Sequence, residues 1–387
     1  FQIIARARGS VDAQGLTAGL GLPVAGLVEG ETDYGAELLF PRGGNAQPSP
    51  FTVRINSELV GLRVGLPEPF LKSAAEAASI SGDIAFIPGG QRITSRGEAD
   101  GGVSWDVAFA RDGEAWDFER GTLALGGAEL AAAETRGLHI RGNVESVRLD
   151  EWLRLSRGDE QRTGTADRIR SFDVNVQSLR LLGQHLQDHR VRVDRSARDW
   201  LVQFDGELVK GSVFVPYDFG SDRAVVLDME RLILPGDAAA QADNAGGEQI
   251  DPRTLPPITL KAGEFALGNR FLGAMETQLG RTDQGLVAES FIARDESFEV
   301  VGNARWVADA TDPSGYRSHL MATLTSTDVK ATMQRLKYAP GIVSDDMNLL
   351  FDLSWSGGPR TDVFDTLDGD VQVRIGVGQL DEIEPGA

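Results

Sequence analysis

Histidines are the first residues to consider for chemistry, because the sequence has four of them and no cysteine. His185 and His189 stand four positions apart with Asp188 between them, a spacing that binds metal when the residues share one helix face. Their context is typical of the start of a strand, where positions i and i+4 lie far apart. We therefore expect a solvated turn here and no metal site. His139 and His319 stand alone in strand patterns, and we expect outward-facing polar side chains there instead of catalytic bases.

Acidic side chains are abundant, but they gather where turns are expected. The densest examples are Asp345, Asp346, Asp362, Asp365, Asp368 and Asp370. A glycoside hydrolase needs two carboxyl groups at a fixed separation in one pocket, whereas turn formation explains acids beside glycine-rich segments. No glycine-rich phosphate loop and no serine nucleophile elbow has the required spacing. The sequence therefore predicts no catalytic residues, no metal and no cofactor, and we do not expect an enzyme.

The charge and the hydropathy of the sequence argue against further classes of partner and of protein. The formal net charge is -20, from 58 acidic and 38 basic residues. Phosphate backbones and anionic membrane surfaces both attract basic faces, so this balance argues against a nucleic-acid partner and against general membrane adhesion. The sequence contains no run of 18 apolar residues, which is the length that would predict a transmembrane helix. The chain begins at Phe1 in the middle of a strand pattern, and we interpret it as part of a longer protein.

The elements that would position any site are short strands with an apolar residue at every second position. This alternation predicts sheets with one apolar and one polar face. The residues expected to line the apolar face are Val53, Ile55, Leu62, Val64, Val107, Phe109, Val174, Val176, Trp200, Val202, Phe204, Val213, Val215, Leu349, Phe351, Leu353, Trp355, Val371, Val373 and Ile375. For a single tryptophan, a role as core anchor and a role in lining an open face require the same inward direction, so both remain open.

The predicted fold is mainly β: an elongated, highly curved and twisted antiparallel sheet with an apolar channel and a few short helices. We expect β segments over 1–148, over 149–235 beginning with a helix at 149–156, and over 258–387 with a helix at 327–338. Residues 236–257 are predicted to be a flexible linker because 236–248 has no apolar period. About 25 strands at ~4.8 Å spacing would extend roughly 120 Å, and open sheets rarely exceed about ten strands without curling. Strong curvature resolves this and turns the apolar face into a trough.

Three functions are compatible with such a chain to different degrees. The first is a conduit for lipid, with acyl chains on the apolar face. The second is a structural or adhesin-like β protein whose apolar faces close into sandwiches and carry no lipid. The third is a carbohydrate-active enzyme with paired carboxylates, which the scattered acids do not favour.

Several phrases, in order along nearly the whole chain, resemble the YhdP family of AsmA-like envelope proteins. They are GLRVGLPEPFLKSAAE at 61–76, RGTLALG at 120–126, GLHIRG at 137–142, LDEW at 149–152, DPRTLPP at 251–257, LGA at 272–274, TSTD at 325–328, YAP at 338–340, LSWSGGP at 353–359, LDG at 367–369 and GQLDEIEPGA at 378–387. Two departures are the Phe70-Leu71 pair, where the family often has Leu-Gly, and the long segment 236–250.

The resemblance implies a repeating β-groove, a long U-shaped sheet similar to those of bridge-like lipid transporters. It implies phospholipid as the partner and the periplasm of a Gram-negative envelope as the location. It further implies an inner-membrane anchor and contacts with the inner and outer membranes through ends that lie outside this segment.

Overall fold

The structure is a computed structural model, and it divides the chain into two compact units. The described residues are 3–13, 15, 27–40, 51–87, 89–113, 115–149, 151–152, 169–181, 184–196, 198–217, 222–235, 251–339, 341–358 and 366–380. The N-terminal unit comprises Phe1–Leu181 with Gln187–Arg195, and the C-terminal unit comprises Leu182–Leu186 with Ser196–Ala387. The segment boundaries predicted at 148, 235 and 257 remain predictions.

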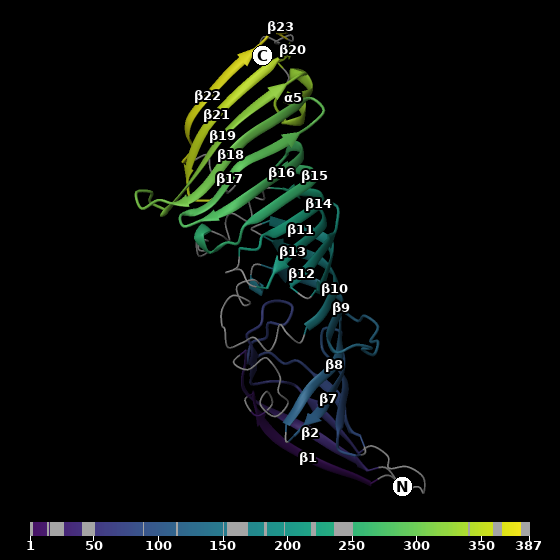
Figure 1. Ribbon diagram of the computed structural model, residues 1–387. Helices are drawn as coiled ribbons and strands as arrows, with labels where there is room; N and C mark the ends of the chain where they lie inside the picture. The colour runs from purple at the N-terminus through teal and green to yellow at the C-terminus, as the bar shows by residue number, and fades with distance from the viewer. Residues whose placement is uncertain are drawn as a thin grey trace. The chain divides into compact units, whose positions relative to one another are not determined.

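The N-terminal unit is one layer of strands that follow each other side by side (Figure 1). Its strands are β1 (Ile3–Asp12), β2 (Val28–Phe40), β3 (Phe51–Ser57), β4 (Leu62–Val64), β5 (Ile80–Phe86), β6 (Arg92–Ala99), β7 (Val103–Asp112), β8 (Ala115–Leu125), β9 (Gly137–Arg148), β10 (Ile169–Leu181) and most of β11 (Gln184–Arg195). β1 pairs with β2, β2 with β3, β3 with β5, and β5 to β9 each with the next. β4 instead pairs with the first residues of β2.

The C-terminal unit repeats this arrangement. Its elements are β12 (Asp199–Asp205), β13 (Val209–Pro216), β14 (Val225–Leu234), the 3-10 helix η2 (Pro252–Thr254), β15 (Ile258–Leu267), β16 (Arg270–Thr282), β17 (Gly285–Arg294), β18 (Phe298–Ala308), β19 (Tyr316–Ser326), α5 (Val329–Arg335), β20 (Ile342–Ser344), β21 (Met347–Ser356), β22 (Asp368–Ile375) and β23 (Gly378–Leu380). Figure 1 shows β17 to β22 as one twisted, curved layer with α5 beside its end. The side chains of β18 alternate between sheltered and exposed along its length, as period-two patterning requires.

The sheets are mixed, which corrects the expectation of purely antiparallel pairing. Most neighbours are antiparallel, but β8 with β9, β9 with β10 and β14 with β15 are parallel. Two neighbouring strands can be parallel only if the chain between them runs back to the end at which the first strand began. The three connections are the segments 126–136, 149–168 and 235–257, which are longer than hairpin turns. The fold class is otherwise as predicted: mainly β, with open sheets.

One face of each sheet is polar, and oppositely charged side chains lie opposite each other on it. In the N-terminal unit one row crosses six strands in the order Arg6, Glu37, Arg54, Asp83, Arg96 and Asp106. Ion pairs of 2.8, 2.8 and 2.6 Å join the first, third and last couples of that row. Like charges placed opposite each other are destabilising, so this alternation favours the observed register over its alternatives.

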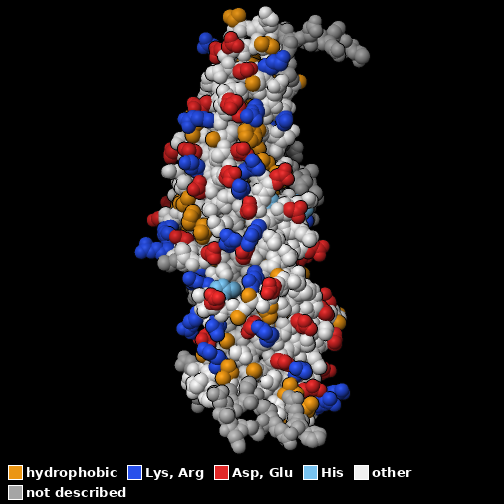
Figure 2. Space-filling model, turned by 90° about the vertical axis from the view of Figure 1, so that its right-hand side faces the viewer, with side chains coloured by type: hydrophobic (Ala, Val, Ile, Leu, Met, Phe, Trp, Pro, Cys, Tyr) orange, Lys and Arg blue, Asp and Glu red, His pale blue; other side chains and the backbone are white. Residues whose placement is uncertain are grey.

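Basic and acidic side chains are also interspersed over the face drawn in Figure 2, where apolar side chains gather only in small groups. Opposite charges also pair between β10 and β11, where Arg190 of β11 donates two hydrogen bonds of 2.7 and 2.8 Å to the Asp173 carboxylate of β10. These bonds hold the pKa of the Asp173 carboxyl below its ordinary value of 3.8.

Helix α5 confirms the helix predicted at 327–338, with closer bounds. Asp328 caps its start by accepting a hydrogen bond of 2.9 Å from the amide of Ala331. The helix ends at Leu336, and Lys337 has a positive φ of 62°, which cannot continue a right-handed helix. For the helix predicted at 149–156, Leu149, Glu151 and Trp152 are helical, and 153–156 lies outside the described residues. The same holds for 236–250 of the predicted linker.

Candidate functional site

The apolar face of the C-terminal unit is built from cross-strand rows. Partners in the pairing register point to the same side of a sheet. One row takes a residue from each of ten strands: Val202, Val213, Leu227, Leu260, Thr277, Phe291, Gly302, Ala322, Phe351 and Val371. The next row is Phe204, Gly211, Met229, Ala262, Met275, Ala293, Val300, Leu324, Leu349 and Val373. Thr277 is the one residue with a polar side chain in these two rows.

The N-terminal unit has an apolar face of the same construction. One of its rows is Leu38, Val53, Ile84, Ser95, Val107, Gly121 and Leu138. The next is Ala36, Ile55, Gly82, Gly97, Trp105, Leu123, Ile140 and Phe172. Each unit therefore presents a surface of aliphatic and aromatic side chains, interrupted by glycine and single hydroxyl groups.

The structure places the residues predicted for the apolar face on these rows, or on rows beside them, with two exceptions. Trp200, Val215, Leu353, Trp355 and Ile375 share the strands and alternation of the C-terminal rows, and Phe109, Val174 and Val176 those of the N-terminal rows. The two exceptions, Leu62 and Val64, lie on the short strand β4, where they pair with Gly30 and Val28 of β2, at even spacing from Ala36 and Leu38. That these side chains contact a ligand remains a prediction.

Sequence reasoning missed the apolar residues between β14 and β18, such as Leu260, Met275 and Phe291. For Phe291 the reason is local: β17 has an extra residue between Ala288 and Phe291 relative to both neighbouring strands. A bulge of this kind breaks the period-two pattern in the sequence while the residues on either side keep one face. The spacing of its apolar residues is the signal that could have revealed the apolar face of β17: Leu286, Ala288, Phe291 and Ala293.

Much of the apolar face is only partly covered. Val371 is 52% exposed and Val373 is 59% exposed, and Phe40 and Phe86 of the N-terminal unit are 40% and 37% exposed. Most of the remaining predicted residues are intermediate in exposure, and Phe109, Val174, Val176 and Phe204 are buried. A face of this extent that stays partly open is unusual for a protein without a ligand or partner on it.

Large rings lie flat on this face because glycines on the neighbouring strands make room for them. A Cβ atom added at Gly82 would lie 2.9 Å from the indole of Trp105, and one at Gly97 would also meet that ring. The Trp105 Nε1 donates to the Ser95 hydroxyl at 3.1 Å, which fixes the ring across the strands. Phe291 lies over Gly302 in the same way, with its ring atoms 2.8 Å from the Cβ position. The rings therefore cover the backbone without standing up from the sheet.

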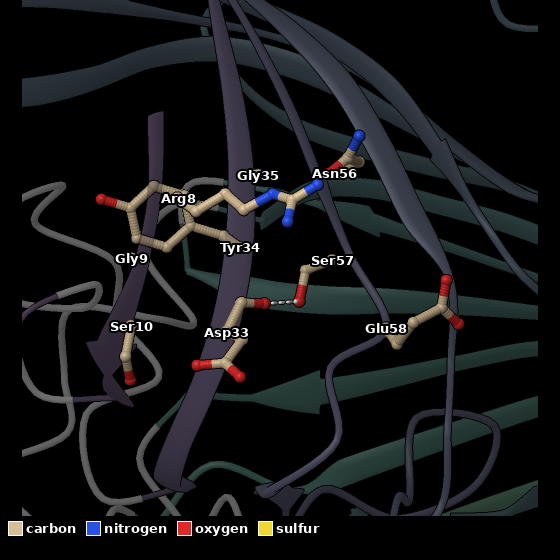
Figure 3. Close-up of a pocket in the computed structure, with 9 residues that line it drawn as sticks. All are labelled: Arg8, Gly9, Ser10, Asp33, Tyr34, Gly35, Asn56, Ser57 and Glu58. Atoms are coloured by element: carbon tan, nitrogen blue, oxygen red, sulfur yellow. Dashed lines mark hydrogen bonds between the residues drawn. The ribbon is translucent and has the colours of Figure 1, made fainter. Parts of the chain in front are cut away.

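A polar depression of about 640 Å³ lies in the N-terminal unit, at β1, β2 and β3 (Figure 3). Its lining includes Arg8, Ser10, Asp33, Asn56 and Glu58, which alternate with the apolar-face positions of their strands. Figure 3 shows the Ser57 hydroxyl bonded to the Asp33 carbonyl oxygen within it. Because it belongs to the polar face, this depression does not extend the apolar surface.

The residues considered for chemistry do not form a reactive site among the described residues. His189 lies in strand β11 with 1% exposure, and its Nδ1 is 2.8 Å from the Gln187 carbonyl oxygen, so the expected solvated turn is wrong. His139 and His319 face the polar side, where they contact Ser171 and Asp352 at 2.7 Å. Within the described ranges, no three His, Cys, Asp or Glu side chains come together as metal ligands would. In the same ranges, no helix is long and apolar enough to cross a membrane.

Comparison with known proteins identifies relatives. A family model described as "YhdP protein" matches residues 1–387. The chain is 18% identical over 372 residues to a protein of Escherichia coli (strain K12) named "Intermembrane phospholipid transporter YhdP". That match covers 94% of this chain and 28% of the relative, so the chain spans between a quarter and a third of the relative's length. No solved structure matches the chain.

Proposed function

The chain belongs to the YhdP family, and from this premise we propose that its apolar faces bind the acyl chains of phospholipids in transit between two membranes. The proposal has two parts. The cargo class follows from the name of the E. coli relative, an intermembrane phospholipid transporter. The cross-strand rows described above support the apolar face as the place where the cargo binds.

The observation that carries the proposal is the length of an apolar row. The row from Val202 to Val371 crosses ten strands within one unit. Nine intervals of about 4.8 Å give roughly 43 Å. One acyl chain occupies about 15 Å of a bilayer, half of its hydrocarbon thickness. The row is therefore about three times longer than one chain and offers a sequence of equivalent positions.

The energetics suit extraction and movement. Moving one methylene group from water to an apolar surface is worth about 0.8 kcal/mol, so sixteen methylenes provide on the order of 10 kcal/mol. Movement also requires that no single position be much deeper than its neighbours. Rows of Val, Leu, Ala, Met and Phe, with rings lying flat over glycines, provide such similar positions.

The wider role is proposed for the longer protein of which this chain would be a part. We place that protein in the periplasm of a Gram-negative cell, anchored in the inner membrane, with contacts to both membranes supplied by segments outside this chain. The acidic charge of -20 keeps the polar faces hydrated and leaves the apolar face as the part suited to lipid.

The alternative of closed sandwiches receives less support. A sandwich buries the inward residues of both sheets against each other. The long strands of each unit instead pair side by side in one layer, and among the described strands β20 and β23 form a separate short pair. On that layer Phe351 and Leu353 are only partly buried.

Site-specific photo-crosslinking tests the proposal. A benzoylphenylalanine at Phe351 faces the apolar side, and one at the neighbouring Leu350 faces the polar side with similar access, because Leu350 is 39% exposed. In cells expressing the full-length protein, we expect irradiation to attach phospholipid at position 351 and not at 350, as read by mass spectrometry of the adduct. Equal attachment at both positions, or attachment at neither, would contradict acyl-chain binding on this face.

A further inference from the structure

The two long edges of the apolar face in the C-terminal unit differ in chemistry. At one edge β12, β14, β15, β17, β19 and β22 begin and β13, β16, β18 and β21 end. We call this the aromatic edge, because five amphipathic rings occupy it. They are Trp200, Tyr217, Trp306, Tyr316 and Trp355.

The rings of the aromatic edge have a common orientation where hydrogen bonds define it. Trp355 Nε1 donates to the Gly358 carbonyl oxygen at 2.9 Å, and the Tyr217 hydroxyl donates to the Ser196 carbonyl oxygen at 2.5 Å. Both acceptors lie outside the strands, at the ends where the chain turns. Trp200 packs edge-on against Tyr217 with ring centroids 5.6 Å apart. The polar atoms of Trp355 and Tyr217 thus point to the boundary, whereas the Trp306 Nε1 is buried and has no hydrogen-bond partner among the described residues. The ring bodies continue the apolar surface.

The opposite edge is covered. Val329, Met333 and Leu336 of the α5 region pack on apolar-face residues of β18, β19 and β21. As a result Phe298, Leu324 and Met347 are each 3% exposed. A buried network beneath the helix joins the hydroxyls of Ser326 and Thr332 at 2.8 Å and leads from Thr332 to the Ser297 carbonyl oxygen at 3.1 Å. We call this edge the helix edge, and α5 covers the part of it formed by β16, β18, β19 and β21.

One cation occupies an apolar-face position at the aromatic edge. Arg281 pairs in register with Leu286, which pairs with Trp306, and this row continues to Ser318 and Trp355. Its guanidinium is 3.2 Å from the Asp222 carboxylate, and Asp222 is fully exposed. A guanidinium beside an exposed carboxylate offers donors to a phosphate and an acceptor to an ammonium group.

We propose that phospholipid headgroups follow the aromatic edge of the C-terminal unit, with acyl chains on the rows beneath and away from the helix edge. This rests on the proposed binding of acyl chains to the apolar face and adds a fixed orientation across it. Tryptophan and tyrosine collect where lipid headgroups meet hydrocarbon, because one part of the ring is apolar and the other forms hydrogen bonds. The aromatic edge reproduces that boundary along one side of the face, and α5 covers part of the other.

Two photoactivatable phosphatidylethanolamines test the proposal on the unmodified full-length protein: one carries a diazirine on the headgroup, the other at the end of an acyl chain. Peptide mapping should find the headgroup probe on peptides containing Trp200, Trp306 to Tyr316 or Trp355, and the acyl probe on rows such as Leu320 and Leu353. Headgroup labelling concentrated on 329–338, at the helix edge, would overturn the inference while acyl labelling of the rows still supported lipid binding. Failure of the acyl probe to label any apolar row would instead refute the proposed function itself.

A pair of variants adds a second measurement. Arg281→Gln removes the guanidinium at the aromatic edge, and Tyr338→Phe is the control change beside α5. Headgroup labelling should fall about tenfold in Arg281→Gln, as loss of one charge-assisted hydrogen bond gives, and stay unchanged in Tyr338→Phe. No loss in Arg281→Gln, or an equal loss in both variants, would refute the inference.

Discussion

A charge placed on the apolar face should block lipid passage, whereas the same charge on the other face of the same strand should not. Leu353 and Leu350 make this comparison within β21, because they lie three residues apart on opposite faces of one strand. Leu353 is partly buried in the row with Leu320 and Gly369, and Leu350 is 39% exposed beside Gln372. Both Leu353→Asp and Leu350→Asp introduce the same side chain into the same strand.

The size of the effect can be worked from the strand spacing. A chain that crosses strands passes one every ~4.8 Å, which corresponds to about four methylene groups. A hydrated carboxylate at position 353 keeps about that many methylenes off the surface, at ~0.8 kcal/mol each, or about 3 kcal/mol. Since 1.4 kcal/mol is a factor of ten, phospholipid passage across position 353 should slow roughly 200-fold in Leu353→Asp, while other positions of the row stay able to bind.

The assay is lipid transfer between two vesicle populations by the full-length variants. Leu350→Asp should keep the transfer rate within about twofold of the parent protein, and Leu353→Val should do the same. Circular dichroism and a thermal melt verify that the sheet is formed in each variant. Comparable transfer rates in folded Leu353→Asp and Leu350→Asp would refute the reasoning, because the two faces would then be equivalent to the lipid.

Three further predictions concern stability and local structure. Val329 of α5 is fully buried, so Val329→Ala should lower the free energy of unfolding of the C-terminal unit by about 2 kcal/mol in chemical denaturation. Gln334 is exposed on the same helix, and Gln334→Ala should change that free energy little. Equal effects of the two substitutions would mean that α5 is not anchored as described. Gly97→Ala should lower the melting temperature and shift tryptophan fluorescence, because the new Cβ meets the Trp105 ring and the Ser81 carbonyl oxygen. The new Cβ of Gly341→Ala enters open space, so that substitution should leave both measurements unchanged. An unshifted spectrum in Gly97→Ala would contradict the flat position of the Trp105 ring. The pKa of Asp173 is lowered by hydrogen bonds from Arg190, so its contribution to stability is present above the ordinary value of 3.8 and disappears as the pH falls through the lower folded value. Asp173→Asn should accordingly destabilise the protein most near neutral pH, and the difference from the parent should shrink below about pH 3.8; a difference independent of pH between 2 and 7 would show that ionisation of this carboxyl is not involved.

Alternation made some positions predictable and left others hidden. Val202 and Phe351, far apart in the sequence, were both expected on the apolar face, and the register places them on one row. Leu62 was expected on the apolar face with Val53, and it lies on the short strand β4, which pairs with the first residues of β2 and not with β3. Phe291 was not expected, because the bulge in β17 shifts the spacing of its apolar residues.

The aromatic edge shows why a candidate site of this kind is only partly visible in the sequence. Trp200, Trp306 and Trp355 each fit equally well as core anchors, since a single strand does not reveal how far its end lies from the boundary of the sheet. That these three tryptophans lie at one edge of the sheet is visible only once strand pairing aligns the starts and ends of successive strands. The cover over the opposite edge depends on where α5 packs, which its amphipathic pattern does not state.

The sequence by itself determined the mainly β class, the separation of polar and apolar residues along each strand, the helix after β19 and the lack of a recognisable reactive motif. These are local properties, because side chains alternate along any extended strand whatever lies beside it. Only the tertiary structure decided which strands are parallel, which residues share a row, and which edge is covered. Those features depend on pairing between segments distant in the sequence, where bulges and long connections set the register and one residue of slip would exchange the two faces.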